Sequence, residues 1–279
     1  MNKRVKISAE KLIIALAITS TLGLSGCATT TKDSVSGVKR SQLLLLPASQ
    51  VTSMSAEAYT QTIAEDKKKN TLNVNQAEVD RVRTISNRLI AQVGVFRPDA
   101  VNWKWEVNVE KNDQLNAYCM PGGKIMVYSG MMEKLQATDD ELAAVIGHEM
   151  SHALREHGRE RMSQAFVQQF GLQALATIFT SPAGSAAVQA AGTGSQLFFA
   201  LPNSRLQETE ADRMGLELAA RAGYNPDAAV TLWQKMTTMN KGAPPEFLST
   251  HPASENRIAD LKALAPKVRP LYEAAKADK

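Results

Sequence analysis

The sequence predicts an α+β fold in which helices are in the majority. Three observations lead to this prediction. Apolar residues recur at helical spacing early in the chain, then alternate with polar residues over a short stretch, and return to helical spacing from Thr138 onward. With 279 residues, 44% of them hydrophobic and 22% charged, the chain has room for one sizeable core or two small ones. This composition excludes a collagen, a disordered chain and a disulfide-dense scaffold.

The first 26 residues resemble a secretory signal peptide. A positively charged start, Met1 to Lys6, precedes an apolar run, Leu12 to Leu22, that is short for a bilayer crossing of about 20 residues. The signal ends in Leu24-Ser25-Gly26-Cys27, which resembles a bacterial lipobox, so we expect cleavage before Cys27 and lipidation of its thiol. The alternative is an ordinary secretory signal in which the cysteine occurs by chance.

The residue after Cys27 is alanine rather than aspartate, which by resemblance to lipoprotein sorting signals favours the outer membrane. We therefore expect a lipid-anchored protein of the bacterial cell envelope that faces the periplasm. If Cys27 carries lipid, Cys119 has no partner in the chain. We expect Cys119 to be a small buried apolar residue rather than a nucleophile or half of a disulfide.

The formal net charge of +4 does not indicate a nucleic-acid-binding protein. The first eleven residues carry +3 of this charge and leave +1 for all the rest, whereas a nucleic-acid binder needs a basic face. No nucleic acid is therefore expected among the partners.

The apolar pattern also sets the order of the expected elements. Residues 27–52 are rich in Ser, Thr and Lys and are expected to form the lipidated start and a tether. The elements expected after it are helices over 53–66 and 76–93, a half-buried strand Trp103–Val109, a turn over 121–123, a second strand Lys124–Tyr128, helices from Thr138 to 265, and a C-terminal tail over 266–279.

One stretch of the helical part, residues 162–204, contains no charged residue and no histidine. Its glutamines, together with Pro182 and Gly184, argue against a membrane span. One interpretation is a helical hairpin packed on the core. The other is a mobile cover over a cleft, or a surface that contacts lipid or unfolded protein.

Two of the four histidines lie in the sequence His148-Glu149-Met150-Ser151-His152. The capping box Thr138-Asp139-Asp140-Glu141 starts a helix upstream. On that helix His148 and His152 occupy adjacent turns of one face, so both imidazoles can reach one ion, and Glu149 stands beside them. Two imidazoles, a carboxylate and an open fourth position are the usual catalytic set of zinc, so we expect one Zn²⁺ per chain.

The third ligand must come from elsewhere in the chain. The longer zinc motif with a third histidine fails, because position 155 is arginine and position 158 is glycine. His157 stands nine positions after His148, on the other side of a continuous helix, so we expect it on the surface.

A second helix is expected to begin at the capping box Ser204-Arg205-Leu206-Gln207. It carries three acids, of which Glu208 and Asp212 share a face while Glu210 falls on the opposite side. A ligating carboxylate with a second acid beside it is the arrangement that orients a metal-bound histidine. The alternative is an acidic helix face in solvent.

Five separated motifs follow one another in this order: Asn116-Ala117, Pro121-Gly122-Gly123-Lys124-Ile125, His148-Glu149-x-x-His152, Glu208-x-Glu210-Ala211-Asp212-Arg213-x-Gly215 and Ser249-Thr250-His251-Pro252. Together they resemble a family of zinc peptidases that includes the CAAX prenyl protease, the HtpX stress protease, the mitochondrial Oma protease and periplasmic proteases of the BepA and LoiP type. The resemblance covers roughly residues 50–265.

This resemblance implies a zinc metallopeptidase domain over residues 53–265 with the compact gluzincin fold, in which an edge strand of a small sheet borders the active-site cleft. It implies His148, His152 and Glu208 as the metal ligands, with Asp212 supporting the histidines. A peptidase of this kind needs a general base, and Glu149 is the expected one.

Two further residues are candidate donors to the oxyanion that develops on the substrate, His251 and Arg257. His251 could instead be a fourth metal ligand at rest or a cap of the following helix. Arg257 could instead be the ion-pair partner of a buried acid. The strand expected to pair with an extended substrate comprises Lys124, Ile125, Met126, Val127 and Tyr128.

The sequence therefore predicts a membrane-anchored zinc endopeptidase that cuts misfolded or misassembled envelope proteins, with unfolded polypeptides and, through Cys27, the membrane as partners. Two other classes stay open: a lipoprotein chaperone that holds clients in the same groove with little cleavage, and a lipoprotein that stores or delivers zinc. The motifs favour the enzyme, because neither a chaperone nor a zinc store needs Glu149. The physiological substrate, the cleavage preference and the oligomeric state are left open.

Overall fold

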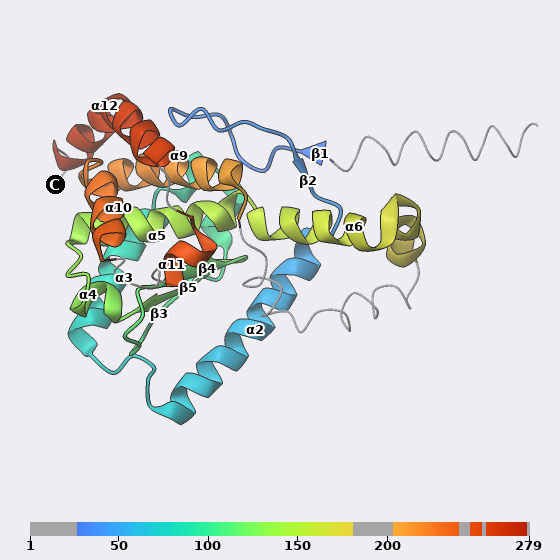
Figure 1. The fold of residues 1–279 in the computed structure, drawn as a ribbon, viewed down its shortest axis with the longest axis horizontal. Coiled ribbons are helices and arrows are strands. Elements are labelled where there is room, and N and C mark those ends of the chain that lie inside the picture. Colours follow the sequence, from blue (N-terminus) through green and yellow to red (C-terminus); the bar gives the residue numbers. More distant parts are fainter. Residues whose placement is uncertain (1–26, 181–202, 240–245, 253–254, 278–279) are drawn as a thin grey trace, which may run out of the picture.

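A computed structural model describes residues 27–180, 203–239, 246–252 and 255–277. Within these residues, helices surround a small three-stranded sheet, which confirms the α+β class with helices in the majority (Figure 1). The expected signal peptide and residues 181–202 of the uncharged stretch lie outside the described residues.

The sheet consists of β3 (Glu106–Glu110), β4 (Ala117–Met120) and β5 (Lys124–Tyr128) in the order β3-β5-β4. β5 runs parallel to β3 and antiparallel to β4, so it is hydrogen-bonded along both edges. The prediction that Lys124–Tyr128 pairs with substrate is therefore wrong, because the main-chain groups of a central strand are already used by its neighbours. The two edge strands are β3 and β4, one on each side of β5.

The helices follow the capping and spacing signals, with three differences in length. α2 begins directly after Pro47, so it is longer than the predicted 53–66. α3 ends three residues short of the predicted 93, and α12 continues through Pro266 and Pro270, so the expected tail is helical and contains the buried Val268. The helices are α2 (Ala48–Lys69), α3 (Gln76–Ile90), α4 (Gly130–Glu133), α5 (Asp139–Leu154), α6 (His157–Thr180), α9 (Arg205–Arg221), α10 (Ala228–Thr238), α11 (Glu246–Thr250) and α12 (Glu255–Ala277), with short 3-10 turns at Val93–Val95 and Pro98–Asn102.

α5 lies at the centre of the fold. Every residue from Glu141 to Leu154 is buried, since α3, α9, α10 and β4 cover the helix on all sides. The capping boxes predicted at Thr138 and Ser204 both form and start α5 and α9. A large apolar core fixes α5 in place, and its fully buried members include Val82, Leu89, Val127, Leu142 and Ile146.

The backbones of α5 and α9 touch where two glycines face each other. A Cβ atom at Gly215 would lie 2.7 Å from the main-chain nitrogen of His148 and 2.9 Å from the carbonyl carbon of Gly147. Real Cβ atoms do not approach backbone atoms so closely. The two helices can therefore cross at this short distance only because position 215 carries no side chain.

The residues expected to form a tether are packed onto the domain, so that prediction is wrong. Residues 27–46, here called the N-terminal strap, form a small antiparallel pair of β1 (Cys27–Ala28) with β2 (Gln42–Leu43) and run beside α9 (Figure 1). Leu44 and Leu46 are buried, and so is the Gln42 side chain. The physical reason is that acids of α6 and α9 are buried beneath the strap and require its donors.

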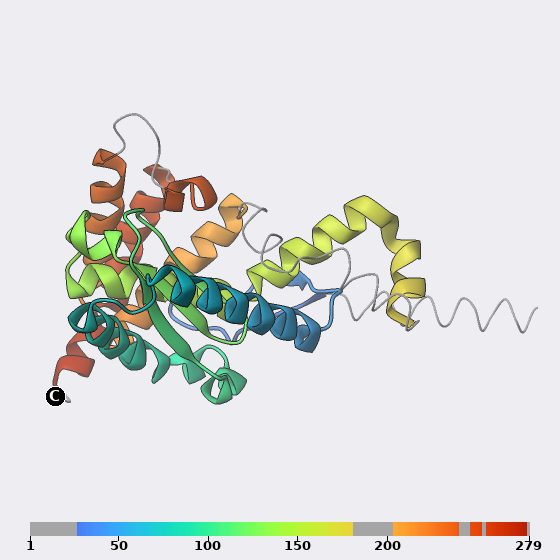
Figure 2. The same cartoon turned by 90° about the horizontal axis from the view of Figure 1, so that it is seen from below.

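α6 extends away from the sheet in both views (Figures 1 and 2). Its first turns are held by the strap and α2, because Met162 packs with Leu46, Val51 and Met54. The helical part of the prediction for residues 162–204 is confirmed as far as Thr180. Among the described residues, no helix combines the length and apolar character that a membrane crossing needs.

The glycine contact gives a prediction about stability. Gly→Ala inside a helix normally stabilises by up to about 1 kcal/mol. We expect Gly215→Ala instead to lower the free energy of unfolding by about 1–3 kcal/mol, because the new methyl group pushes α9 away from α5. Urea unfolding measures the change, with Arg205→Ala on the exposed start of α9 as the control. An unchanged or raised midpoint for Gly215→Ala contradicts the backbone contact.

Candidate metal centre

Four side chains with metal-binding atoms meet between α5, α9 and the end of α11. His148 and His152 come from adjacent turns of α5, Glu208 comes from the first turn of α9, and His251 directly follows α11. One atom from each lies within 4.8 Å of the other three, and all four residues are buried. The structure thus brings together the three predicted ligands and adds His251 as a fourth.

The spacing of these atoms suits one tetrahedral ion. The Nε2 atoms of His148 and His152 are 3.1 Å apart, and Nε2 of His148 is 3.3 Å from Nδ1 of His251. Oε1 of Glu208 lies 3.3 Å from Nε2 of His152 and 3.0 Å from Nδ1 of His251. An ion that binds nitrogen and oxygen at about 2.1 Å, as zinc does, separates tetrahedral ligand atoms by about 3.4 Å. The donor set therefore fits a bound metal ion of this kind.

The electrostatics of the centre also favour a cation. Burial by itself lowers the pKa of His148, but hydrogen bonds to Asp212 and Glu208 outweigh burial and raise it to about 9. Burial raises the pKa of Glu208, yet the histidines around it outweigh burial and hold this pKa well below the ordinary value. A negative carboxylate is thus kept inside the protein next to imidazole nitrogens, which is the environment that a divalent metal needs.

Asp212 orients the first histidine. Its Oδ1 lies 3.0 Å from Nδ1 of His148, so this nitrogen carries the proton and Nε2 is left to face the other donors. Arg257 in turn holds Asp212 through two hydrogen bonds, of 2.6 and 2.8 Å. The structure thus places Asp212 where the sequence predicted it, behind His148.

Arg257 is committed to structural contacts. Besides Asp212, its guanidinium contacts Glu208 at 2.9 Å and stacks over the Trp233 ring at 4.0 Å. It also donates to the carbonyl of Pro252 at 3.0 Å, and the residue is only 5% exposed. Of the two roles left open by the sequence, these contacts favour the ion-pair partner over the donor to substrate.

His157 is buried, so the prediction of a surface position is wrong. Its Nδ1 lies 2.8 Å from Nδ1 of His152, and its Nε2 lies 3.0 Å from Oε2 of Glu210. Burial lowers the pKa of His157 to about 4 although Glu210 opposes this, so the imidazole is neutral at pH 7. His157 and Glu210 therefore form a second support behind the metal site, beside His152, which the sequence analysis missed.

The error has a local cause. α5 ends at Leu154, and the chain then turns through Glu156 in the left-handed region, with φ of 53°, before α6 begins at His157. His157 would lie on the far side of α5 only if one helix continued through it. No glycine or proline between His152 and His157 signals this break, because a left-handed residue other than glycine is uncommon and carries no clear sequence mark.

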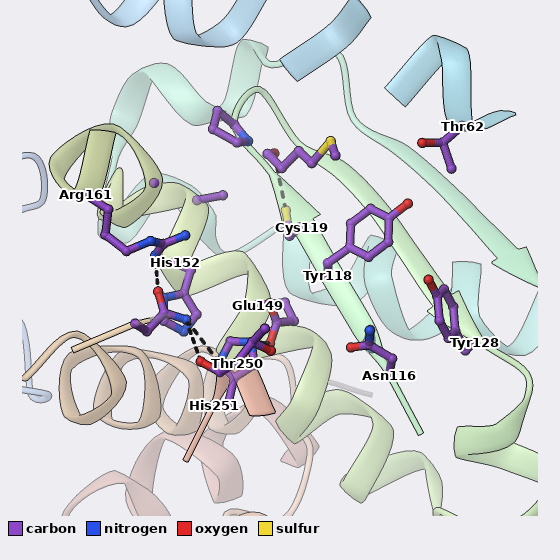
Figure 3. A pocket seen from close by; sticks show the side chains of 16 residues that line it. Thr62, Asn116, Tyr118, Cys119, Tyr128, Glu149, His152, Arg161, Thr250 and His251 are labelled. Atoms are coloured by element: carbon purple, nitrogen blue, oxygen red, sulfur yellow. Dashed lines mark hydrogen bonds and ion pairs between the residues drawn. The ribbon is translucent and has the colours of Figure 1, made fainter. Parts of the chain in front are cut away.

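Glu149 faces a cavity beside His152 and His251 (Figure 3). Its Oε1 is buried, lies 3.4 Å from Nε2 of His251 and makes no hydrogen bond with the described residues. Burial raises the pKa of the Glu149 carboxyl, which makes its anion a stronger base than an exposed glutamate.

The cavity has a volume of about 380 Å³. β4 borders one side of it, while Arg161 and Thr250 line other parts (Figure 3). Asn203 also lines the cavity. The expectation of an edge strand along the cleft is met by β4. Cys119 of this strand is a free buried thiol, as predicted, and burial raises its pKa well above the ordinary value.

At alternate residues of β4, the main-chain N–H and carbonyl groups point away from β5, toward the free edge of the sheet. The N–H of Tyr128 donates to the carbonyl of Asn116. Because hydrogen-bonded and non-hydrogen-bonded pairs alternate in an antiparallel ladder, the main-chain groups of Ala117 and Cys119 point outward, away from β5. Among the described residues the N–H of Ala117 already donates to Oδ1 of Asn116 at 2.9 Å. The groups left for a further extended strand on that side are the carbonyl of Ala117 and the N–H and carbonyl of Cys119.

Comparisons with known proteins agree with this site. The model of peptidase family M48 matches residues 75–265, a range that contains every site residue described above. The mitochondrial metalloendopeptidase OMA1 of Bos taurus is 33% identical over 244 residues, which are 84% of this chain and 46% of that protein. The metalloendopeptidase OMA1 of Saccharomyces cerevisiae is 34% identical over 178 residues, 61% of this chain and 50% of that one.

A bacterial relative is similar over a comparable range. The beta-barrel assembly-enhancing protease of Yersinia pestis is 29% identical over 206 residues, which are 71% of this chain and 41% of that protein. The chain thus spans half or less of the length of these three relatives.

The donor set gives a prediction about metal content. Glu208→Gln removes a charged ligand. Losing a residue that only supports a ligand typically lowers metal affinity about 10–100-fold, and we expect the affinity of this variant for a divalent metal to fall by more than that. Elemental analysis after dialysis against a chelator measures the retained metal. The control is Glu57→Gln at an exposed position of α2. Equal metal retention in both variants contradicts the assignment of Glu208.

Proposed function

This chain belongs to peptidase family M48, and on that basis we propose that it is a zinc-dependent endopeptidase. One observation carries the proposal: a buried carboxylate, Glu149, lies next to four convergent metal-binding groups at a cavity bordered by an edge strand. A metallopeptidase needs all three parts, namely a metal, a base and a place for an extended peptide.

His148, His152 and Glu208 would hold the zinc, with His251 as a fourth ligand when no substrate is bound. Zinc in such a site acts as a Lewis acid and lowers the pKa of bound water toward about 7. Glu149 accepts the proton of the attacking water at its buried Oε1 and later gives it to the leaving amine. His251 lies within 3.4 Å of Glu149 and is positioned to donate a hydrogen bond to the carbonyl oxygen of the substrate.

The polypeptide substrate binds in extended form along β4. Main-chain pairing with Ala117 and Cys119 supplies affinity with little dependence on side chains. An unfolded or misassembled segment offers a free main chain of this kind, whereas the buried main-chain groups of a folded protein are already paired. The substrate class is therefore polypeptide that has not reached its native fold.

The protein acts in the bacterial cell envelope, anchored by lipid on Cys27 to the outer membrane and facing the periplasm. The lipobox-like sequence Leu24-Ser25-Gly26-Cys27 supports this placement. One relative carries the name beta-barrel assembly-enhancing protease, and the same class of client, misassembled envelope protein, suits this chain.

A chaperone that holds clients at the same strand is the second candidate, favoured by the free edge of β4, which serves holding as well as cleavage. The buried base distinguishes the two. A holdase gains nothing from Glu149, whose carboxylate is costly to bury.

Glu149→Gln tests the enzyme directly. The substitution keeps the shape of the side chain and removes the base, so we expect cleavage of casein to fall at least about 100-fold while the zinc content stays at that of the wild type. Glu57→Gln is the control for activity. If neither the wild type nor Glu149→Gln cleaves, yet both suppress aggregation of an unfolded outer-membrane protein, the chaperone is correct.

Strand pairing predicts a periodic dependence on the substrate main chain. In a series of peptides, each with one N-methylated amide, we expect cleavage to fall at every second position near the scissile bond, since one edge of a strand uses alternate amides. Side-chain changes at the same positions should have smaller effects. Cleavage rates by mass spectrometry give the pattern, and a uniform response to N-methylation argues against binding along β4.

A further inference from the structure

A line of buried polar side chains leads from the metal site to the N-terminal strap. Nδ1 of His152 meets Nδ1 of His157 at 2.8 Å, and Nε2 of His157 meets Oε2 of Glu210 at 3.0 Å. Glu210 is then held by Arg40 of the strap, with Nε at 2.9 Å from Oε1 and Nη2 at 3.0 Å from Oε2. The four residues connect three separate parts of the chain, namely the strap, the α5–α6 junction and α9.

One assignment of protons satisfies every contact in this line. Since His152 presents Nε2 to the other metal-binding atoms, its Nδ1 carries a proton and donates it to Nδ1 of His157. His157 then carries its own proton on Nε2 and donates to Glu210. A carboxylate is the acceptor that terminates such a line, and hydrogen bonds of this type fix the orientation of a ligating imidazole.

Arg40 is needed because Glu210 is not the only buried acid there. The same guanidinium also binds Glu160 of α6, through Nη1 at 2.5 Å and Nη2 at 3.0 Å. Arg155 also reaches both oxygens of Glu210, but through one nitrogen and at 3.4 Å, so this contact is longer than those of Arg40. Without Arg40, two carboxylates from α6 and α9 would face each other with too little positive charge between them.

We propose that Arg40 is a positioning residue of the metal site, which holds the Glu210–His157 pair against the ligand His152, so that the strap completes the active site. This proposal rests on the proposed function insofar as His152 is a metal ligand. Arg40 lies outside the range of residues 75–265 that the family model matches, so the family match does not account for it.

The support behind His152 resembles the support behind His148, but contains one more residue. His148 is oriented by Asp212, which Arg257 holds. His152 is oriented by His157 and Glu210, which Arg40 holds. Each of the two histidines of α5 is thus backed by a carboxylate that a guanidinium holds, and one of the two guanidinium groups comes from the strap.

The test measures metal affinity rather than cleavage. We expect Arg40→Gln in the mature chain to bind zinc about 10–100-fold more weakly in a chelator competition, the usual effect of losing a residue that orients a ligand. In the cobalt-substituted protein, the visible ligand-field spectrum should shift, because His152 changes its orientation. Arg40→Lys keeps the charge without the bidentate contact, so its zinc affinity should lie between that of the wild type and that of Arg40→Gln. Lys39→Gln, at the neighbouring exposed residue, should bind zinc like the wild type.

A second variant separates positioning from general loosening of the strap. Ser34→Ala removes the 2.8 Å bond to Glu217 of α9, which is a strap contact apart from the His157 line. We expect this variant to lose stability with zinc affinity and the cobalt spectrum unchanged. The proposal is overturned if Arg40→Gln binds zinc as tightly as Lys39→Gln, or if Ser34→Ala weakens zinc binding as much as Arg40→Gln does. Both outcomes leave the Glu149→Gln test of the peptidase unaffected.

Discussion

The contact between the backbones of α5 and α9 is the constraint on which the rest of the molecule depends. α5 supplies two imidazoles and the proposed base Glu149, and α9 supplies the carboxylate that meets the imidazoles. Side chains normally keep the axes of two packed helices about 8–10 Å apart. Gly215 removes that spacer directly opposite His148. A short carboxylate side chain can then reach the imidazoles with no loop to carry it, so the site rests on two rigid elements.

The buried charges around this contact serve geometry more than stability. Asp212 with Arg257, and Glu210 with Arg40, are pairs whose desolvation roughly offsets their attraction. What they give is direction, because each carboxylate accepts from one imidazole and leaves the opposite nitrogen facing inward. The apolar core around α5 fixes where the helices lie, and these pairs fix how the histidines are turned.

Local signals predicted what depends on local structure. Both capping boxes, the facing pair His148 and His152, and the shared face of Glu208 and Asp212 follow from helical period and hydrogen-bonding rules. The break at Glu156 could not be predicted from such signals, because a left-handed residue other than glycine leaves no mark in the sequence. The order of strands could not be predicted either, since the central strand of the hairpin is the one that β3 pairs with, and no local signal in the sequence specifies this pairing. Arg40 was missed because its acidic partners are 120 and 170 positions away.

The strap has a consequence for where the enzyme can work. If Cys27 carries acyl chains, no flexible linker separates the lipid from the folded domain, because Cys27 and Ala28 are already paired with Leu43 and Gln42. A folded body of this size is roughly 40–50 Å across, so the catalytic cavity would stay within that height above the lipid. Substrate selection would then depend partly on distance from the membrane. Polypeptides near the bilayer surface would be cut, and the same sequences deeper in the periplasm would not.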